Sequence, residues 1–196
     1  KNYLYNLSYQ ILTIILPIIT VPYVTRIFTS EALGNYVFYN SIVSYFSLFA
    51  MLGIGVYGTK QIAAASDVSS TFWNIYAIQL IASILAISVY VITVFSIPQM
   101  GGVIPLIVGI TLLAKMIDIS WLFSGKEDFK KITIRNVVIR IIGVISIFTF
   151  VKSSDDLYLY VFLIVIFDFL GQFVMWVPAK KFIKRPSFNT KIMKKN

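Results

Sequence analysis

The sequence of 196 residues contains no cysteine and no histidine. The first absence excludes disulfides, thiolate nucleophiles and cysteine-ligated zinc, and the second excludes catalysis by an imidazole acid or base. No glycine-rich phosphate-binding loop or other nucleotide-binding motif is present, so we expect no ATP-driven motor in this chain. The sequence therefore predicts a protein that is not an enzyme and that binds no metal or cofactor.

Charged residues are scarce as well. They make up 13% of the chain, against about a quarter in a typical soluble protein, whereas 58% of the residues are hydrophobic. The apolar residues form blocks of about 20, the helix length that crosses roughly 30 Å of hydrocarbon. The sequence predicts an all-α integral membrane protein with about six transmembrane helices, at residues 4–24, 36–57, 72–95, 102–123, 133–151 and 157–178.

The charges that are present are mostly basic, with a net charge of +9, and they are unevenly distributed. An even number of spans places both termini on one side of the membrane. If that side is the cytoplasm, the outer side keeps only Arg26 and Lys152, as the positive-inside rule requires. The cytoplasmic side then carries Lys1, Lys60, Lys126, Lys130, Lys131, Arg135, Lys180, Lys181, Lys184, Arg185, Lys191, Lys194 and Lys195. We expect a multi-pass bacterial plasma-membrane protein with cytoplasmic termini and no nucleic-acid partner.

Two segments follow from this pattern. Residues 1–179 form a six-helix transmembrane lobe, and residues 180–196 form a basic cytoplasmic connector or tail. The chain begins with Lys rather than Met, and its tail is similar to a connector between two halves of a larger transporter. We therefore expect it to be a fragment.

Polar side chains recur at steps of three or four along each apolar span, so each row shares one helix face. The rows are Asn6, Gln10, Thr13, Pro17 and Thr20; Tyr36, Asn40, Ser44 and Ser47; Gln79, Ser83, Ala86, Tyr90 and Thr93; Thr111, Lys115 and Asp118; Thr133, Asn136, Arg140 and Gly143; and Asp168 and Gln172. Two interpretations stay open: helix packing through small and polar residues, or a shared hydrated interior. Charges in three rows make the hydrated interior the simpler hypothesis, because a charge deep in hydrocarbon costs at least about 2.5 kcal/mol.

Four charged residues within the spans are candidates for substrate binding. Lys115 and Asp118 are three apart on one face, so they can also neutralise each other as a purely structural pair. Arg140, expected one or two turns inside the cytoplasmic end of its span, can also snorkel to the interface. Asp168 has no local partner and is the strongest single indication of function, although it can pair with Lys115 or Arg140. The candidate substrate-binding residues are Lys115, Asp118, Arg140 and Asp168, with Gln10 and Asn40 from the polar rows.

Arg26 follows Pro22 and Tyr23 at the outer end of the first span. There an arginine can anchor the helix to lipid head groups. Alternatively, an arginine at the mouth of a cavity can bind phosphate in a bidentate manner. Charge alone leaves both roles open for Arg26.

Three stretches of the sequence resemble the Wzx-type polysaccharide flippases. The first is Leu16-Pro-Ile-Ile-Thr-Val-Pro-Tyr-Val-Thr-Arg-Ile-Phe28 with Glu31-Ala-Leu-Gly34, similar to the Pro-Tyr-x-Ser/Thr-Arg run and Gly-containing turn that end the family's first helix. The others are Gly53-Ile-Gly-x-Tyr-Gly-Thr-Lys-x-Ile-Ala63 and Asp118-x-Ser-Trp-Leu-Phe-x-Gly-x-Glu-Asp-Phe129. Their order matches, and with the helix count the resemblance covers essentially the whole chain.

The resemblance implies the polysaccharide branch of the multidrug/oligosaccharidyl-lipid/polysaccharide superfamily, with two MATE-like six-helix lobes around a central cavity. Members move a sugar repeat unit linked to undecaprenyl diphosphate from the inner to the outer leaflet, by alternating access of the two lobes. The resemblance makes Arg26 a substrate-phosphate candidate. It implies the lipid bilayer, a lipid-linked oligosaccharide, a C-terminal transporter half and a polysaccharide polymerase as partners.

Two other functions remain open at this stage. A multidrug or cation-coupled exporter of the same superfamily would need a coupling carboxylate such as Asp168 or Asp118 and a more apolar cavity. A non-transporting scaffold subunit of polysaccharide assembly would use the polar rows only for helix packing. The leading hypothesis is the N-terminal lobe of a flippase driven by an ion gradient or by substrate concentration.

Overall fold

The computed structural model describes the backbone of residues 2–184 and the side chains of residues 14–98 and 100–184. Within these residues every regular element is a helix. The elements are α1 (Asn2–Ile27), α2 (Ser30–Met51), α3 (Ile54–Ala64), α4 (Val68–Ser96), η1 (Pro98–Met100), α5 (Val103–Met116), α6 (Ser120–Gly125), α7 (Phe129–Phe150), η2 (Ser154–Asp156), α8 (Leu157–Val174) and α9 (Trp176–Ala179).

Five helical segments are long and apolar enough to cross a membrane: Ser30–Ala64, Val68–Ser96, Val103–Gly125, Phe129–Phe150 and Ser154–Ala179. The apolar part of α1, Ile14–Ile27, is a shorter sixth segment. Each segment overlaps one of the six predicted spans, so the all-α integral membrane class is confirmed. The exact number of crossings and the side on which the termini lie stay predictions.

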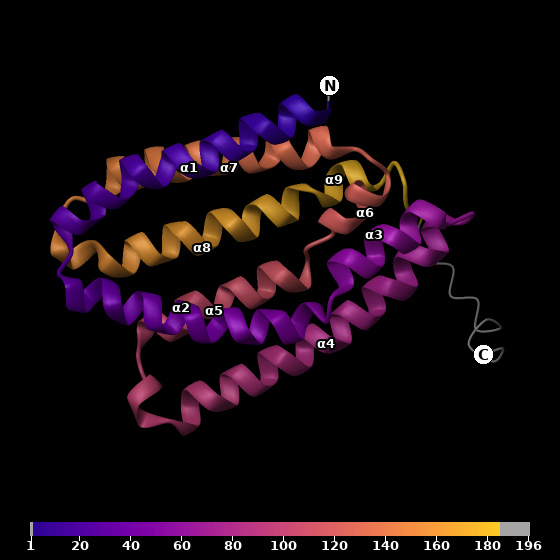
Figure 1. Ribbon diagram of the computed structural model, residues 1–196. Coiled ribbons are helices and arrows are strands. Elements are labelled where there is room, and N and C mark those ends of the chain that lie inside the picture. Colours follow the sequence, from indigo (N-terminus) through magenta and orange to yellow (C-terminus); the bar gives the residue numbers. More distant parts are fainter. Residues whose placement is uncertain (1, 185–196) are drawn as a thin grey trace.

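Successive long helices along the chain run in opposite directions through the bundle (Figure 1). Helix α1 packs on α7, α7 on α8, α8 on α5, and α5 on α2 and α4. Helix α8 therefore joins the α1–α7 pair to the group formed by α2, α4 and α5. The start of α1 and the end of α9 lie at the same end of the bundle as α3 and α6. We call it the basic end, because Lys60 of α3, Lys126 after α6 and Lys130 at the start of α7 lie there.

Two of the predicted spans are interrupted near the basic end. Helix α2 stops at Met51, and Leu52 and Gly53 adopt left-handed φ angles of 42° and 72° before α3 begins. Helix α5 stops at Met116, and the Asp118 carboxylate accepts a hydrogen bond of 2.9 Å from the Ser120 amide to start α6. The spans at 36–57 and 102–123 are therefore bent, because residues that favour a local turn interrupt their apolar runs.

Gln79 of α4 bridges the interruption between α5 and α6. Its side chain is completely buried, and its amide nitrogen donates hydrogen bonds of 2.9 Å to the carbonyls of Lys115 and Asp118. Its amide oxygen accepts a bond of 3.0 Å from the Trp121 indole N–H. A broken helix inside a membrane needs such partners for the carbonyls that it frees.

Two other members of the polar row on α4, Ser83 and Tyr90, also join this helix to its neighbours. The Tyr90 hydroxyl donates a hydrogen bond of 2.7 Å to the Pro105 carbonyl, and Ser83 donates one of 3.4 Å to the Ala50 carbonyl. These side chains are buried between α4 and its neighbours. For this row the helix-packing interpretation is the correct one.

Replacing Gln79 by alanine is expected to lower the free energy of unfolding by about 1–3 kcal/mol, because the Lys115 and Asp118 carbonyls and the Trp121 indole lose a shared partner. The measurement is thermal unfolding of the purified protein in detergent. Gln61→Ala, on the exposed side of α3, is the matched control and is expected to leave the unfolding temperature unchanged. Equal stability of the two variants would show that Gln79 does not hold the interruption together.

A cluster of aromatic residues fills the core of the basic end. Phe72 stacks on Trp121 with ring centroids 5.3 Å apart, and Tyr76 meets Trp176 edge to face at 4.9 Å. Helices α3 and α6 pack together over this cluster, with Gly58 against the Trp121 ring. The second and third stretches that resemble the flippases thus meet here, and they build the core of this end.

Candidate functional site

A cavity of about 480 Å³ lies between helices α1, α2, α5, α7 and α8. Its position follows from the packing, because α8 joins the α1–α7 pair to the α2–α5 pair. Its polar lining consists of Thr20, Tyr36, Asn40, Thr111, Arg140, Tyr160 and Asp168. Five of the six polar rows therefore contribute at least one residue to this lining, and the row on α4 contributes none.

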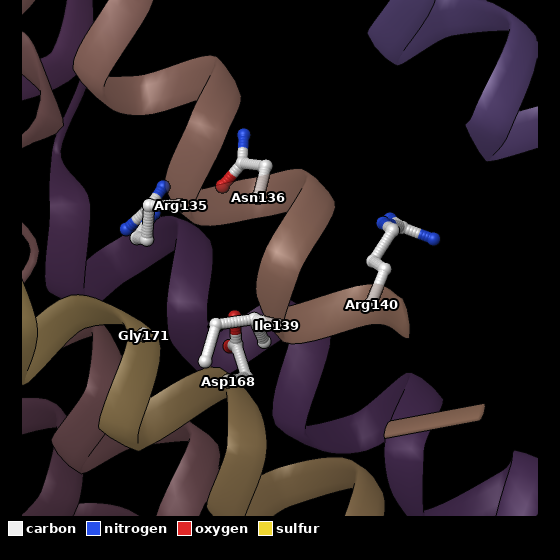
Figure 2. A pocket seen from close by; sticks show the side chains of 6 residues that line it. All are labelled: Arg135, Asn136, Ile139, Arg140, Asp168 and Gly171. Atoms are coloured by element: carbon white, nitrogen blue, oxygen red, sulfur yellow. The ribbon is translucent and has the colours of Figure 1, made fainter. Parts of the chain in front are cut away.

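A smaller cavity of about 90 Å³ adjoins the first between α7 and α8. Arg135, Asn136 and Gly171 line it, together with three residues that also line the larger cavity, Ile139, Arg140 and Asp168. Figure 2 shows Arg135, Asn136 and Arg140 on α7 and Asp168 on α8 below them. The two cavities form one continuous polar region with Arg140 and Asp168 at the junction.

Arg140 lies midway along α7, which extends from Phe129 to Phe150. At 1.5 Å per residue it is roughly 15 Å from either end of the helix. The predicted depth of one or two turns was too shallow, because α7 starts four residues earlier than the predicted span. A guanidinium this deep needs a polar surrounding, and the junction of the two cavities provides one.

Asp168 also lies well inside its helix, and its side chain is exposed to the cavities. Lys115 lines neither cavity, whereas Arg140 lies with Asp168 at their junction, so the pairing of Asp168 with a basic residue of another helix stays a prediction. Figure 2 shows the Arg140 side chain turned away from Asp168. The carboxylate is thus presented to the cavity.

Arg135 is a site residue that the sequence reasoning missed. Counting charges placed it with the cytoplasmic residues, but it lies more than a turn inside α7 and lines the smaller cavity. Its guanidinium donates a hydrogen bond to the side-chain oxygen of the buried Gln172 on α8. A Cβ atom on Gly171 would lie 3.7 Å from the Arg135 side chain and 3.2 Å from Ile139, so this glycine lets α7 and α8 approach closely. The cost of burying a charge, applied to Arg140, could have identified Arg135 too.

Lys115 and Asp118 line neither cavity. The predicted ion pair between them does not form in the described part of the chain. The reason is local: the helix ends at Met116, and Asp118 turns to bind the Ser120 amide, so the two side chains no longer share a helical face.

Arg26 lies in the last turn of α1 with an exposed side chain, beyond Val21, where the α1 lining of the cavity ends. The structure thus leaves its two predicted roles open. The Gln10 side chain lies outside the described residues. Of the predicted binding residues, the structure brings together Asn40, Arg140 and Asp168.

The apolar helices and the charged cavity between them define a polytopic α-helical membrane protein with a polar interior. Comparison of the sequence with protein families gives the more particular assignment. The family described as "Polysaccharide biosynthesis protein" matches residues 1–196, so the chain belongs to this family. The resemblance to the Wzx-type flippases is confirmed, and the chain is a multi-pass protein of the bacterial plasma membrane.

Two curated relatives are proteins with the name "Putative O-antigen transporter". The one from Escherichia coli (strain K12) is 25% identical over 168 residues, covering 80% of this chain and 39% of the relative. The one from Shigella dysenteriae is 23% identical over 180 residues, covering 90% of this chain and 44% of the relative. The chain thus spans about two fifths of the length of these relatives. No solved structure gives a significant match.

Proposed function

We propose that the chain forms one lobe of a flippase that moves undecaprenyl-diphosphate-linked polysaccharide repeat units from the inner to the outer leaflet. The observation that carries the proposal is the polar region between the apolar helices, where Arg135 and Arg140 line connected cavities with Asp168. Membership of a polysaccharide biosynthesis family and similarity to proteins named as O-antigen transporters support the substrate class.

The chemistry of such a substrate fits this lining. Guanidinium groups bind phosphate oxygens with paired hydrogen bonds, so Arg135 and Arg140 would hold the diphosphate. Hydroxyl and amide groups of Thr20, Asn40 and Thr111 would bond to the sugars. Arg26, at the far end of α1, would contact the phosphate near the outer face. The polyprenyl chain would stay in the lipid, along the exposed apolar surface of the helices.

Translocation would need a second lobe. Residues 1–179 would be the first lobe, and residues 180–196 would connect it to the second lobe. The relatives have room for a second lobe, because they are more than twice as long as the matched segment. Rocking of the two lobes would open the cavity to one leaflet and then to the other. A polysaccharide polymerase would use the product on the outer face.

The experiment that tests the proposal measures translocation of lipid-linked oligosaccharide in cells that lack their own flippase. The chain alone is compared with the same chain extended by its downstream coding sequence. We expect transport to be restored by the extended form and not by the chain alone, because one lobe cannot enclose the substrate. Transport by neither form, with both inserted in the membrane, would contradict the proposal.

The second candidate is a cation-coupled exporter of the same superfamily, which Asp168 supports because a carboxylate facing the cavity can bind a cation. Export of a cationic dye by the extended form, without transport of the lipid-linked oligosaccharide, would favour it. If the chain is a scaffold in polysaccharide assembly, neither transport activity is expected. Polysaccharide assembly would then be unaffected when charged cavity residues are replaced by neutral ones.

A further inference from the structure

Asp168 occupies a special position among the residues of the two cavities. It lines both of them, and among the lining residues it is the single acid, whereas Arg135 and Arg140 are the two cations. In Figure 2 its carboxylate points from α8 toward α7, with Arg135 and Arg140 on either side. The polar region thus carries one negative and two positive side chains.

This negative charge works against the binding of an anion. A carboxylate within several ångströms of a bound phosphate raises the free energy of the bound state, because like charges between apolar helices are screened less than in bulk water. Helix packing does not require the charge, because within the described residues the Asp168 carboxylate forms no hydrogen bond and no ion pair. A charge at this depth also costs free energy on membrane insertion, and asparagine of the same shape would avoid that cost.

We infer that Asp168 is a built-in counter-anion, which weakens the binding of the lipid diphosphate so that the substrate can leave on the other side. The inference rests on the proposed function and adds a role for this residue within it. In the empty cavity the carboxylate balances part of the positive potential of Arg135 and Arg140. When the diphosphate enters, the carboxylate repels it and so offsets part of its attraction to the guanidinium groups. Transport requires binding that is strong enough for entry and weak enough for release.

The experiment compares the affinity of the purified protein in detergent for farnesyl diphosphate with that for farnesol, by isothermal titration calorimetry. Asp168→Asn is expected to tighten the binding of farnesyl diphosphate by about tenfold or more, because it removes a negative charge close to the bound diphosphate. It is expected to leave the binding of farnesol unchanged, because farnesol carries no charge. Asp168→Glu keeps the charge and is expected to keep the original affinity. Asp155→Asn removes an exposed carboxylate outside both cavities and is the matched control for net charge.

A second measurement separates binding from release. In the extended form, Asp168→Asn is expected to slow the translocation of lipid-linked oligosaccharide although the probe binds more tightly. Asp168→Ser provides a second neutral variant if the asparagine protein does not fold. The inference alone is overturned if the neutral variant binds farnesyl diphosphate no more tightly than the unsubstituted protein does, and still prefers it to farnesol. Equal binding of both probes by the unsubstituted protein overturns the proposed function and the inference together.

Discussion

Replacing Arg140 by alanine in the extended form is expected to reduce translocation of the lipid-linked oligosaccharide by at least about 30-fold. Its guanidinium lies midway through α7 at the junction of the two cavities, so the substrate loses a charged contact between apolar helices. Removing one partner of such a contact costs roughly 2–5 kcal/mol. The measurement is the transport assay in cells without their own flippase, with the amount of inserted protein determined in parallel.

Two further variants make this prediction specific. Arg140→Lys keeps the charge but loses the planar pair of donors, so intermediate transport is expected. Lys152→Gln removes a cation at the connection between α7 and α8, outside both cavities, and is expected to transport normally. If the Arg140→Ala protein inserts and transports as well as the Lys152→Gln protein, Arg140 is not part of the binding site.

The second large effect is expected at the basic end, where glycines allow α3 and α6 to touch. A Cβ atom on Gly58 would lie 2.7 Å from the Trp121 ring, and one on Gly125 would lie 2.7 Å from Ile62 and 2.8 Å from the Thr59 carbonyl oxygen. Gly58→Ala and Gly125→Ala are each expected to lower the free energy of unfolding by about 1–3 kcal/mol or more, because the packed helices must separate. The measurement is thermal unfolding in detergent together with the yield of monodisperse protein.

Helix α3 offers a control of the same type. A Cβ atom on Gly55 would meet nothing within 4 Å, so Gly55→Ala is expected to leave the stability unchanged or raise it slightly, since alanine favours the helix. Unfolding temperatures of Gly58→Ala and Gly125→Ala that match that of Gly55→Ala would refute the close packing of α3 on α6.

Much of the site followed from the sequence because the relevant physics acts on single residues. A charge inside an apolar run is costly wherever the chain folds, and this argument correctly directed attention to Arg140 and Asp168. Tyr36 and Asn40 of the polar row on α2 also line the cavity, because a neutral polar group in an apolar run is costly as well when it lacks a hydrogen-bond partner. The argument was not applied to Arg135, since its span was predicted to begin too close to that residue.

The failures arose where a residue's role depends on a distant partner. Gln79 belongs to a row that is indistinguishable by spacing from the others, yet its side chain bonds to the chain around Lys115 and Asp118, 36 and 39 residues away. The interruption after Met116 removed the helical pairing of Lys115 with Asp118. Hydropathy counts apolar residues and does not register a single break in a helix.

The sequence alone determined the membrane class, the approximate positions of the apolar helices and the family, because these depend on long runs of similar residues and on short motifs. The tertiary structure decided which polar rows share a cavity and which lie in packed contacts. It also decided that Arg135 and Arg140 lie on either side of Asp168. A helical face fixes the direction of a side chain relative to its own axis, and only the packing of one helix on another decides what that face meets.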